Sequence, residues 1–380
     1  MKQSQSKTTL VCAVCFLAFA FLWLYEFQTD LLAVAQHVLS GGITHYDRTI
    51  GAVIITVVLF LLHLAVYAVT HLSRRTHALT YVPSFLALAF LSDINVSNGN
   101  GVEVVHGWWL LAIIFVLWFG AVWLARQMLP FSDSDKQPTG LFSARTWMNL
   151  VQMCAMMLFV AFFGNTNAVL HYRAHAETAL LRGDNHEAMR VGWESLETDA
   201  QLTMLRAYAL SREGLIGEKL FSYPIAGQGD DLLPMHNEPL LLPADSIWRH
   251  LGGKPAFPMS GKTYYHLLEY DSIATPAVAD YVLCGKLIDR DLKAFVRLLP
   301  HYYGDGLGGL AQGLPLHYRE ALVLYNHLYP STPCAFSDEP LEQLWQQMEQ
   351  LKEQHPANSE QWLQLLENFR GTYWYYYFKP

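Results

Sequence analysis

The N-terminal part of the chain is a series of apolar stretches separated by short polar ones. The stretches lie at approximately 8–25, 50–70, 77–92, 105–125 and 147–167. A helix needs about 20 apolar residues to cross a hydrocarbon layer of about 30 Å. The second and fourth stretches meet this length, and the first and fifth are close to its lower limit. The pattern predicts a bundle of about five transmembrane helices within residues 1–168.

The third stretch is the shortest. Its apolar part, LTYVPSFLALAFL, covers residues 79–91. Two interpretations stay open: the segment crosses the membrane with local thinning or tilt, or it is re-entrant or buried among the other helices. Pro83 suits the first turn of a helix.

The positions of the basic residues favour five crossings. If the N-terminus is cytoplasmic and all five stretches cross, Arg48 is the only Lys or Arg in the outer loops. If the third stretch does not cross, the basic residues divide evenly between the two sides. Cytoplasmic loops normally carry the excess of Lys and Arg, so we expect a C-terminal part outside the cytoplasm, in the periplasm if the source is a bacterium. The basic residues on the inside are then Lys2, Lys7, Arg74, Arg75, Arg126, Lys136 and Arg145.

Residues 169–380 show amphipathic helices with turn signals instead of apolar stretches. A predicted helix from His171 ends at Gly183, and Asp184 and Glu187 have the spacing of a capping box. Another predicted helix ends at Gly214. This succession of helices and tight turns, with this spacing along the sequence, is similar to tetratricopeptide repeats. Ala200 departs from that pattern, which usually has Pro at this position.

A second helical unit of this kind is predicted about a hundred residues later, over 277–303 and 314–328. Between the two units, the Pro- and Gly-rich residues 221–275 predict an irregular insert with short helices at 245–251 and 260–270. The expected fold is therefore all-α, with a transmembrane bundle followed by an extracytoplasmic, tetratricopeptide-like domain.

The C-terminus, GTYWYYYFKP, is dense in aromatic residues. One stripe at helical spacing predicts a single helix face that packs on the core. Trp374, Tyr375 and Phe378 lie off this face and predict a second neighbour, which could be another protein, the membrane interface or a pocket. The stripe consists of Trp362, Leu365, Leu366, Phe369, Tyr373, Tyr376 and Tyr377.

The charge differs between the two halves of the chain. Residues 1–170 carry eight Lys or Arg and seven Asp or Glu, whereas residues 171–380 carry 17 and 26, a net charge of −9. Nucleic-acid binding needs clustered basic residues, so an acidic second half argues against nucleic acid as a partner.

Candidate chemistry is sparse, and we expect no cofactor and no metal. His45, Asp47 and Arg48 lie together in GGITHYDR, before the second apolar stretch. They could form an acid–base or anion-binding group at the membrane surface, or Asp47 could cap the helix while Arg48 anchors it. Cys284 and Cys334 could form a disulfide in an exported domain.

Several stretches resemble an uncharacterised family of multi-span inner-membrane proteins from Bacteroidota-type bacteria. The resemblance implies a multi-span N-terminal half and a repeat-like C-terminal half, and it implies no activity. It is carried by AQHVLSGGITHYDRTIGAV (35–53), LETDAQLTMLRAYALSREG (196–214), TPAVADYVLCG (275–285), LPLHYREALVLYNHL (314–328) and GTYWYYYF (371–378).

Two functional hypotheses follow. In the first, an inner-membrane protein presents a helical-repeat domain to another envelope protein or peptide, because repeat domains provide extended binding surfaces. In the second, the protein is a membrane-embedded enzyme that acts on a lipid or glycan intermediate at the outer face through His45, Asp47 and Arg48. Membrane lipid is an expected partner in both.

Overall fold

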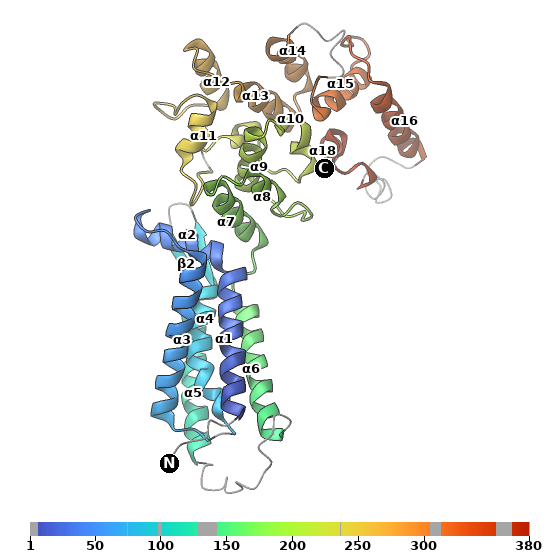
Figure 1. Ribbon diagram of the computed structural model, residues 1–380. Helices are drawn as coiled ribbons and strands as arrows, with labels where there is room; N and C mark the ends of the chain where they lie inside the picture. The colour runs from blue at the N-terminus through green and yellow to red at the C-terminus, as the bar shows by residue number, and fades with distance from the viewer. Residues whose placement is uncertain are drawn as a thin grey trace. The chain divides into compact units, whose positions relative to one another are not determined.

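The computed structural model describes residues 7–73, 75–97, 101–127, 143–235, 237–304, 313–354 and 367–379. The chain divides into two compact units, Met1–Asn167 and Ala168–Pro380 (Figure 1). Within the described residues, the regular structure is helical except for one two-stranded hairpin. The fold is therefore all-α.

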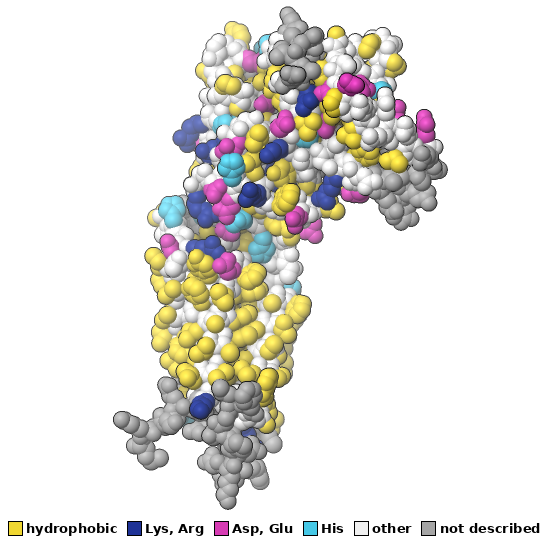
Figure 2. All heavy atoms as spheres, turned by 45° about the vertical axis from the view of Figure 1, so that its right-hand side comes forward, with side chains coloured by type: hydrophobic (Ala, Val, Ile, Leu, Met, Phe, Trp, Pro, Cys, Tyr) yellow, Lys and Arg dark blue, Asp and Glu magenta, His cyan; other side chains and the backbone are white. Residues whose placement is uncertain are grey.

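The first unit contains four helices that are long and apolar enough to cross a membrane, counted over the residues that the structure describes. No more than 28% of the apolar window of each is buried within the protein, and hydrophobic side chains cover the face of these helices drawn in Figure 2. A helix with such an apolar exterior suits a lipid environment. The elements of this unit are α1 (Lys7–Leu22), η1 (Trp23–Phe27), α2 (Thr29–Ser40), α3 (Arg48–Thr70), η2 (His77–Tyr81), α4 (Val82–Ser92), β1 (Ile94–Ser97), β2 (Gly101–Val104), α5 (Trp108–Gln127) and α6 (Ala144–Phe163).

The short segment formed by η2 and α4 differs from the long helices because it is mostly enclosed by them. Most residues of α4 are buried, with Pro83 in its first turn as the sequence predicts. Neighbouring helices also supply hydrogen bonds: Asn149 Oδ1 of α6 accepts from the amide of Ala78 at 2.7 Å, and Ser84 Oγ donates to Leu59 O of α3 at 2.8 Å. A segment surrounded by protein need not match the hydrocarbon thickness by its own length.

Hydrogen bonds fix which ends of the helices lie together. At one end, the Arg126 guanidinium donates to Thr70 O at 2.9 Å, and the Asn149 amide donates to Arg145 O and Arg75 O. At the other end, Trp23 Nε1 donates to Ser92 Oγ at 2.8 Å. The segment from η2 to α4 therefore runs from the first end of the bundle to the second, opposite to α3.

The hairpin of β1 and β2 was not predicted from the sequence. Its antiparallel strands pair Ile94 with Val104 and Val96 with Val102, and they contact α2. Alternating apolar residues before Asn98-Gly99 are a hairpin signal that the sequence analysis missed.

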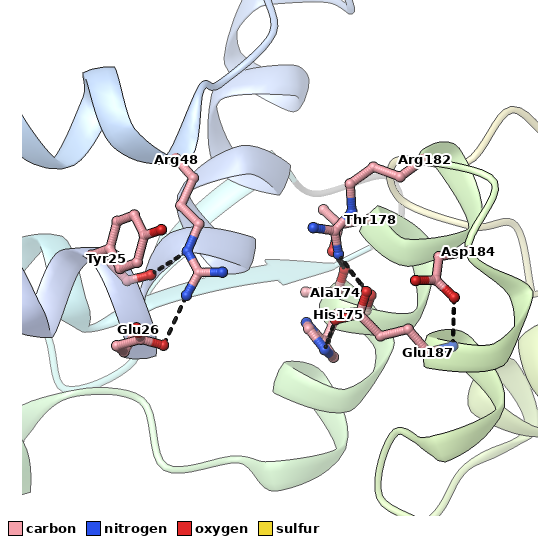
Figure 3. Close-up of polar contacts among 9 residues, drawn as sticks. All are labelled: Tyr25, Glu26, Arg48, Ala174, His175, Thr178, Arg182, Asp184 and Glu187. Atoms are coloured by element: carbon pink, nitrogen blue, oxygen red, sulfur yellow. Dashed lines mark hydrogen bonds and ion pairs between the residues drawn. The ribbon is translucent and has the colours of Figure 1, made fainter.

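The second unit is built from shorter helices around one hydrophobic core. As predicted, Gly183 and Gly214 follow α7 and α9 with left-handed backbones, at φ +78° and +67°. The Asp184 carboxylate accepts from the Glu187 amide at 2.8 Å and caps α8, as Figure 3 shows. The elements are α7 (Ala168–Leu181), α8 (Asn185–Arg190), α9 (Ala200–Arg212), α10 (Ile216–Lys219), η4 (Leu220–Ser222), η5 (Gly229–Leu232), α11 (Ala244–Leu251), α12 (Gly261–Tyr270), α13 (Ala277–Ile288), α14 (Leu292–Tyr303), α15 (Leu316–Leu328), α16 (Glu339–Gln354), η7 (Glu367–Phe369) and α18 (Tyr373–Phe378).

The C-terminal aromatic segment is not the single helix that the stripe predicts. Gly371, at φ +95°, lies in a turn between η7 and α18, because the left-handed backbone is easily reached only by glycine. Trp362, Leu365 and Leu366 lie outside the described residues.

Trp374 and Tyr375 are buried in the core of the second unit, and Phe378 packs against that core. Trp374 Nε1 donates to Glu320 O of α15 at 2.8 Å, and its ring meets Trp345 of α16 edge-on at 5.2 Å. The second neighbour predicted for these residues is the chain itself, because α18 packs between two helices rather than on one.

Candidate functional site

The structure does not assemble His45, Asp47 and Arg48 into one reactive group. Asp47 Oδ1 accepts from the Ile50 amide at 2.7 Å and caps α3. The Arg48 guanidinium donates to Tyr25 O and to Glu26 Oε2, both at 2.8 Å (Figure 3), and lies 4.1 Å from the centre of the Tyr25 ring. His45 is exposed. Asp47 and Arg48 thus fasten the start of α3, which is the structural alternative stated above.

We predict that Asp47→Ala loosens the first turn of α3 by about 0.5–2 kcal/mol, the usual effect of removing an N-cap. Asp47→Ser should keep most of the protection of the Ile50 amide against hydrogen exchange, because a serine hydroxyl also caps a helix. Hydrogen exchange of the Ile50 amide measures both effects. Equal loss of protection in the two variants would contradict the capping role.

Asp93, near the start of the hairpin, pairs with His106 rather than with His45 or Asp47. Its side chain is fully buried, and its two oxygens accept from His106 Nδ1 at 2.7 Å and from the His106 amide at 2.8 Å. These bonds close the base of the hairpin, so the pair has a structural role.

Cys284 and Cys334 are free thiols and are not joined in the structure. Cys284 is buried with its sulfur 3.4 Å from the Tyr318 hydroxyl, and the thiol of Cys334 donates to Asn326 Oδ1 at 3.1 Å. Burial raises the pKa of both thiols, which leaves them poor nucleophiles at neutral pH.

One recess in the second unit is a cleft of about 310 Å³ between η5, α12, α13 and α14. We call it the tyrosine cleft, because three of its lining residues are Tyr265, Tyr281 and Tyr302. The Tyr302 hydroxyl donates to Glu269 Oε1 at 2.5 Å and links α14 to α12. The volume is at the lower end of the range for small-ligand sites.

Two tyrosine hydroxyls in this cleft lack hydrogen-bond partners among the described residues. Tyr281 is 0% exposed and Tyr265 is 9% exposed, and both hydroxyl oxygens are buried. Burial raises the pKa of both hydroxyls, so they stay neutral and can donate. Buried polar groups in folded proteins are nearly always paired, and two unpaired donors in one recess mark it as a candidate ligand site.

The charged residues around the tyrosine cleft are not equivalent. The carboxylates of Asp230 and Asp289 accept from the amides of Gly261 and Gly229 at 3.1 and 2.8 Å, and Asp291 caps α14. In contrast, the exposed cations Lys262 and Arg297 have no hydrogen bond or ion pair within the described part of the chain. The cleft is therefore lined by two exposed cations and by two tyrosines whose hydroxyls are buried and neutral.

A close backbone approach forms one wall of the cleft. A Cβ atom added at Gly229 would lie 2.6 Å from Gly285 O. Only glycine allows η5 and α13 to approach so closely. The two glycines are far apart in the sequence, and nothing local shows that they meet. The sequence alone therefore does not reveal the cleft.

His175 of α7 lies beside a carboxylate of α8. His175 Nε2 contacts Glu187 Oε1 at 3.1 Å, and Arg182 contacts the other oxygen of that carboxylate at 3.0 Å (Figure 3). Within the described ranges, no group of three or more His, Cys, Asp or Glu residues could hold a metal ion.

Comparison with known proteins finds a similarity over part of this unit. Residues 264–380 match the model of a family of unknown function, DUF6057. The comparisons with curated proteins and with solved structures gave no match. The matched segment contains most of the tyrosine cleft and the whole aromatic C-terminus. The C-terminal part of the chain is thus similar to an uncharacterised domain.

Proposed function

We propose that this protein is a multi-span protein of a bacterial inner membrane whose second unit binds another envelope protein in the tyrosine cleft. The occupant is a peptide segment that places an acidic side chain between Lys262 and Arg297. Its backbone carbonyls accept hydrogen bonds from Tyr265 and Tyr281. The observation that carries this proposal is that two tyrosines with buried hydroxyls, unpaired among the described residues, line the same cleft as the exposed cations Lys262 and Arg297.

The membrane part of the proposal has five crossings, with a cytoplasmic N-terminus and a periplasmic second unit. It is supported by the charges at the two ends of the bundle. Arg75, Arg126 and Arg145 share one end, and Lys7 joins them because the adjacent Thr8 bonds to Thr146 at 2.9 Å. Arg48 lies at the other end. An end rich in Lys and Arg normally faces the cytoplasm.

The second unit is proposed to be tetratricopeptide-like. The contacts of α7 and α8 with α9, and of α13 with α14, support this proposal. Helical pairs of this kind provide a rigid frame for a binding cleft.

The unpaired hydroxyls predict an unusual response to mutation. Tyr281→Phe should leave the second unit equally stable or stabilise it by about 1 kcal/mol, because a buried hydroxyl without a partner is unfavourable. Tyr264→Phe is the matched control. It should destabilise the unit by about 1 kcal/mol, because it removes the bond from Tyr264 Oη to Gly253 O at 2.7 Å. Hydrogen exchange of α13 and α12 amides measures both, and a loss of stability in Tyr281→Phe would contradict this account.

The partner can be identified by photocrosslinking in the intact membrane. A photoreactive amino acid is placed at His266, an exposed residue of the cleft, and at Phe257, which is 64% exposed and does not line the cleft. We expect a defined protein adduct from His266 only, and its loss in the double variant Tyr265→Phe, Tyr281→Phe. The same adducts from both positions, or an adduct that persists in the double variant, would refute the proposed site.

The enzymatic alternative has no observation in its favour. Asp47 and Arg48, which it would use for chemistry, hold the start of α3, and His45 is exposed.

A further inference from the structure

A second recess of the second unit has the opposite electrostatic character. It has a volume of about 210 Å³, and we call it the basic pocket because its charged lining residues are Arg290, Arg370 and Lys379. Among the described residues, no Asp or Glu lines it, although residues 171–380 carry a net charge of −9. Tyr223, Tyr375 and Tyr376 form its aromatic walls. A local group of cations in an acidic domain favours an anionic ligand.

The three cations retain donors for a ligand. Arg290 donates from Nη2 to Tyr376 O and Lys379 O at 3.2 and 2.8 Å, and its Nε and Nη1 groups make no hydrogen bond to a described residue. Lys379 Nζ donates to the Tyr375 hydroxyl at 3.0 Å and has two further protons. The exposed Arg370 side chain makes no hydrogen bond or ion pair to any described residue.

One carboxylate lies close by without lining the pocket. The Tyr375 hydroxyl donates to Glu367 Oε1 at 2.6 Å. The bond chain from Lys379 through Tyr375 to Glu367 orients the tyrosine and lowers the positive charge at that edge. Arg290 and Arg370 are not paired with this carboxylate.

We propose that the basic pocket binds a phosphate group. Two guanidinium groups and one ammonium supply several charge-assisted donors, which suits the three or four oxygens of a phosphate monoester or diester better than a single carboxylate. The phosphate could belong to a lipid headgroup or to a soluble phosphoester, and the test separates these two sources. The site is distinct from the tyrosine cleft and does not depend on the peptide-binding function proposed above.

Arg370→Gln is the informative variant, because the Arg370 side chain makes no hydrogen bond or ion pair to a described residue. The substitution therefore removes no such contact from the folded protein. Arg290 is unsuitable, since its guanidinium also holds the C-terminal backbone. Arg249→Gln is the control: this exposed arginine lies on α11, outside the pocket, and donates only to Asp245 O at 3.3 Å.

The probes are inorganic phosphate and dihexanoyl phosphatidic acid, added to the full-length protein in an uncharged detergent at constant ionic strength. Dihexanoyl phosphatidylcholine, whose phosphate carries a choline, is the lipid control. The apparent dissociation constant is obtained from the dependence of Tm on probe concentration.

We expect both probes to stabilise the wild type and Arg249→Gln in a saturable way. In Arg370→Gln the apparent dissociation constant should be at least about tenfold higher than in the wild type, which is the effect of losing one charge-assisted contact. Tighter binding of phosphatidic acid than of phosphate assigns a lipid headgroup, and equal binding assigns a soluble phosphoester. Absence of saturable binding by either probe, or equal binding by Arg370→Gln and the wild type, would overturn the proposal.

Discussion

Replacing Glu177 with alanine is expected to lower the free energy of unfolding of the second unit by about 3–5 kcal/mol. The fully buried carboxylate of this α7 residue accepts hydrogen bonds from the amides of Leu240, Leu241 and Leu242. Its removal leaves these amides without their acceptor, and each buried unpaired group costs about 1–3 kcal/mol. Burial raises the pKa of Glu177, while the three amides and Arg173 act in the opposite direction.

The measurement is hydrogen exchange of the α7 and α9 amides in the full-length protein. Glu177→Gln keeps the volume and one acceptor oxygen, so its effect should be smaller than that of Glu177→Ala. Glu197→Ala removes an exposed carboxylate and should change the stability by less than about 0.5 kcal/mol. If Glu177→Ala and Glu197→Ala were equally stable, the carboxylate would not be holding the 240–242 segment on α7.

Trp374→Ala is expected to have a similar effect, with a loss of about 3–5 kcal/mol. The indole is 0% exposed, so truncation leaves a cavity between α15 and α16 and removes the bond from Nε1 to Glu320 O. The adjacent amide of Tyr373 donates to Glu320 Oε2 at 2.7 Å, and the whole C-terminal segment should therefore become susceptible to proteolysis.

Limited proteolysis of the full-length protein measures this effect through the rate of cleavage after residue 367. Trp193→Ala is the matched control, because that indole is 61% exposed. A Trp374→Ala protein that resists proteolysis as the wild type does would show that the indole is not part of the core. Trp374 would then be available to a partner, as its position off the aromatic stripe predicts.

Local signals in the sequence were sufficient for the helices of the second unit. Gly183, Asp184 and Gly214 act through the backbone of their own turns, so their effect does not depend on distant parts of the chain. Ser260 likewise caps α12, the helix predicted over 260–270, by accepting from the Thr263 amide at 3.3 Å. The helix predicted over 245–251 begins one residue earlier, at Ala244.

Features that depend on long-range contacts could not be read in this way. Periodicity placed Trp374 off the core-facing stripe, and it could not show that the second neighbour of Trp374 is another helix of the same chain. The tyrosine cleft requires Gly229 to meet Asp289 and Tyr302 to meet Glu269. These contacts join segments that are far apart in the sequence, and no local sequence pattern predicts how such segments lie relative to one another.

The enclosed position of α4 has a consequence for how the protein is made. The amide of Ala78 finds its acceptor in Asn149, and the carbonyl of Leu79 finds its donor in Trp118, at 2.8 Å. Both partners follow α4 in the chain and are synthesised after it. The segment is also too short to be held firmly in the bilayer by its own hydrophobicity. The segment therefore reaches its final position late, once α5 and α6 have been inserted. A chain that stops before residue 144 lacks α6, and the bundle then stays incomplete.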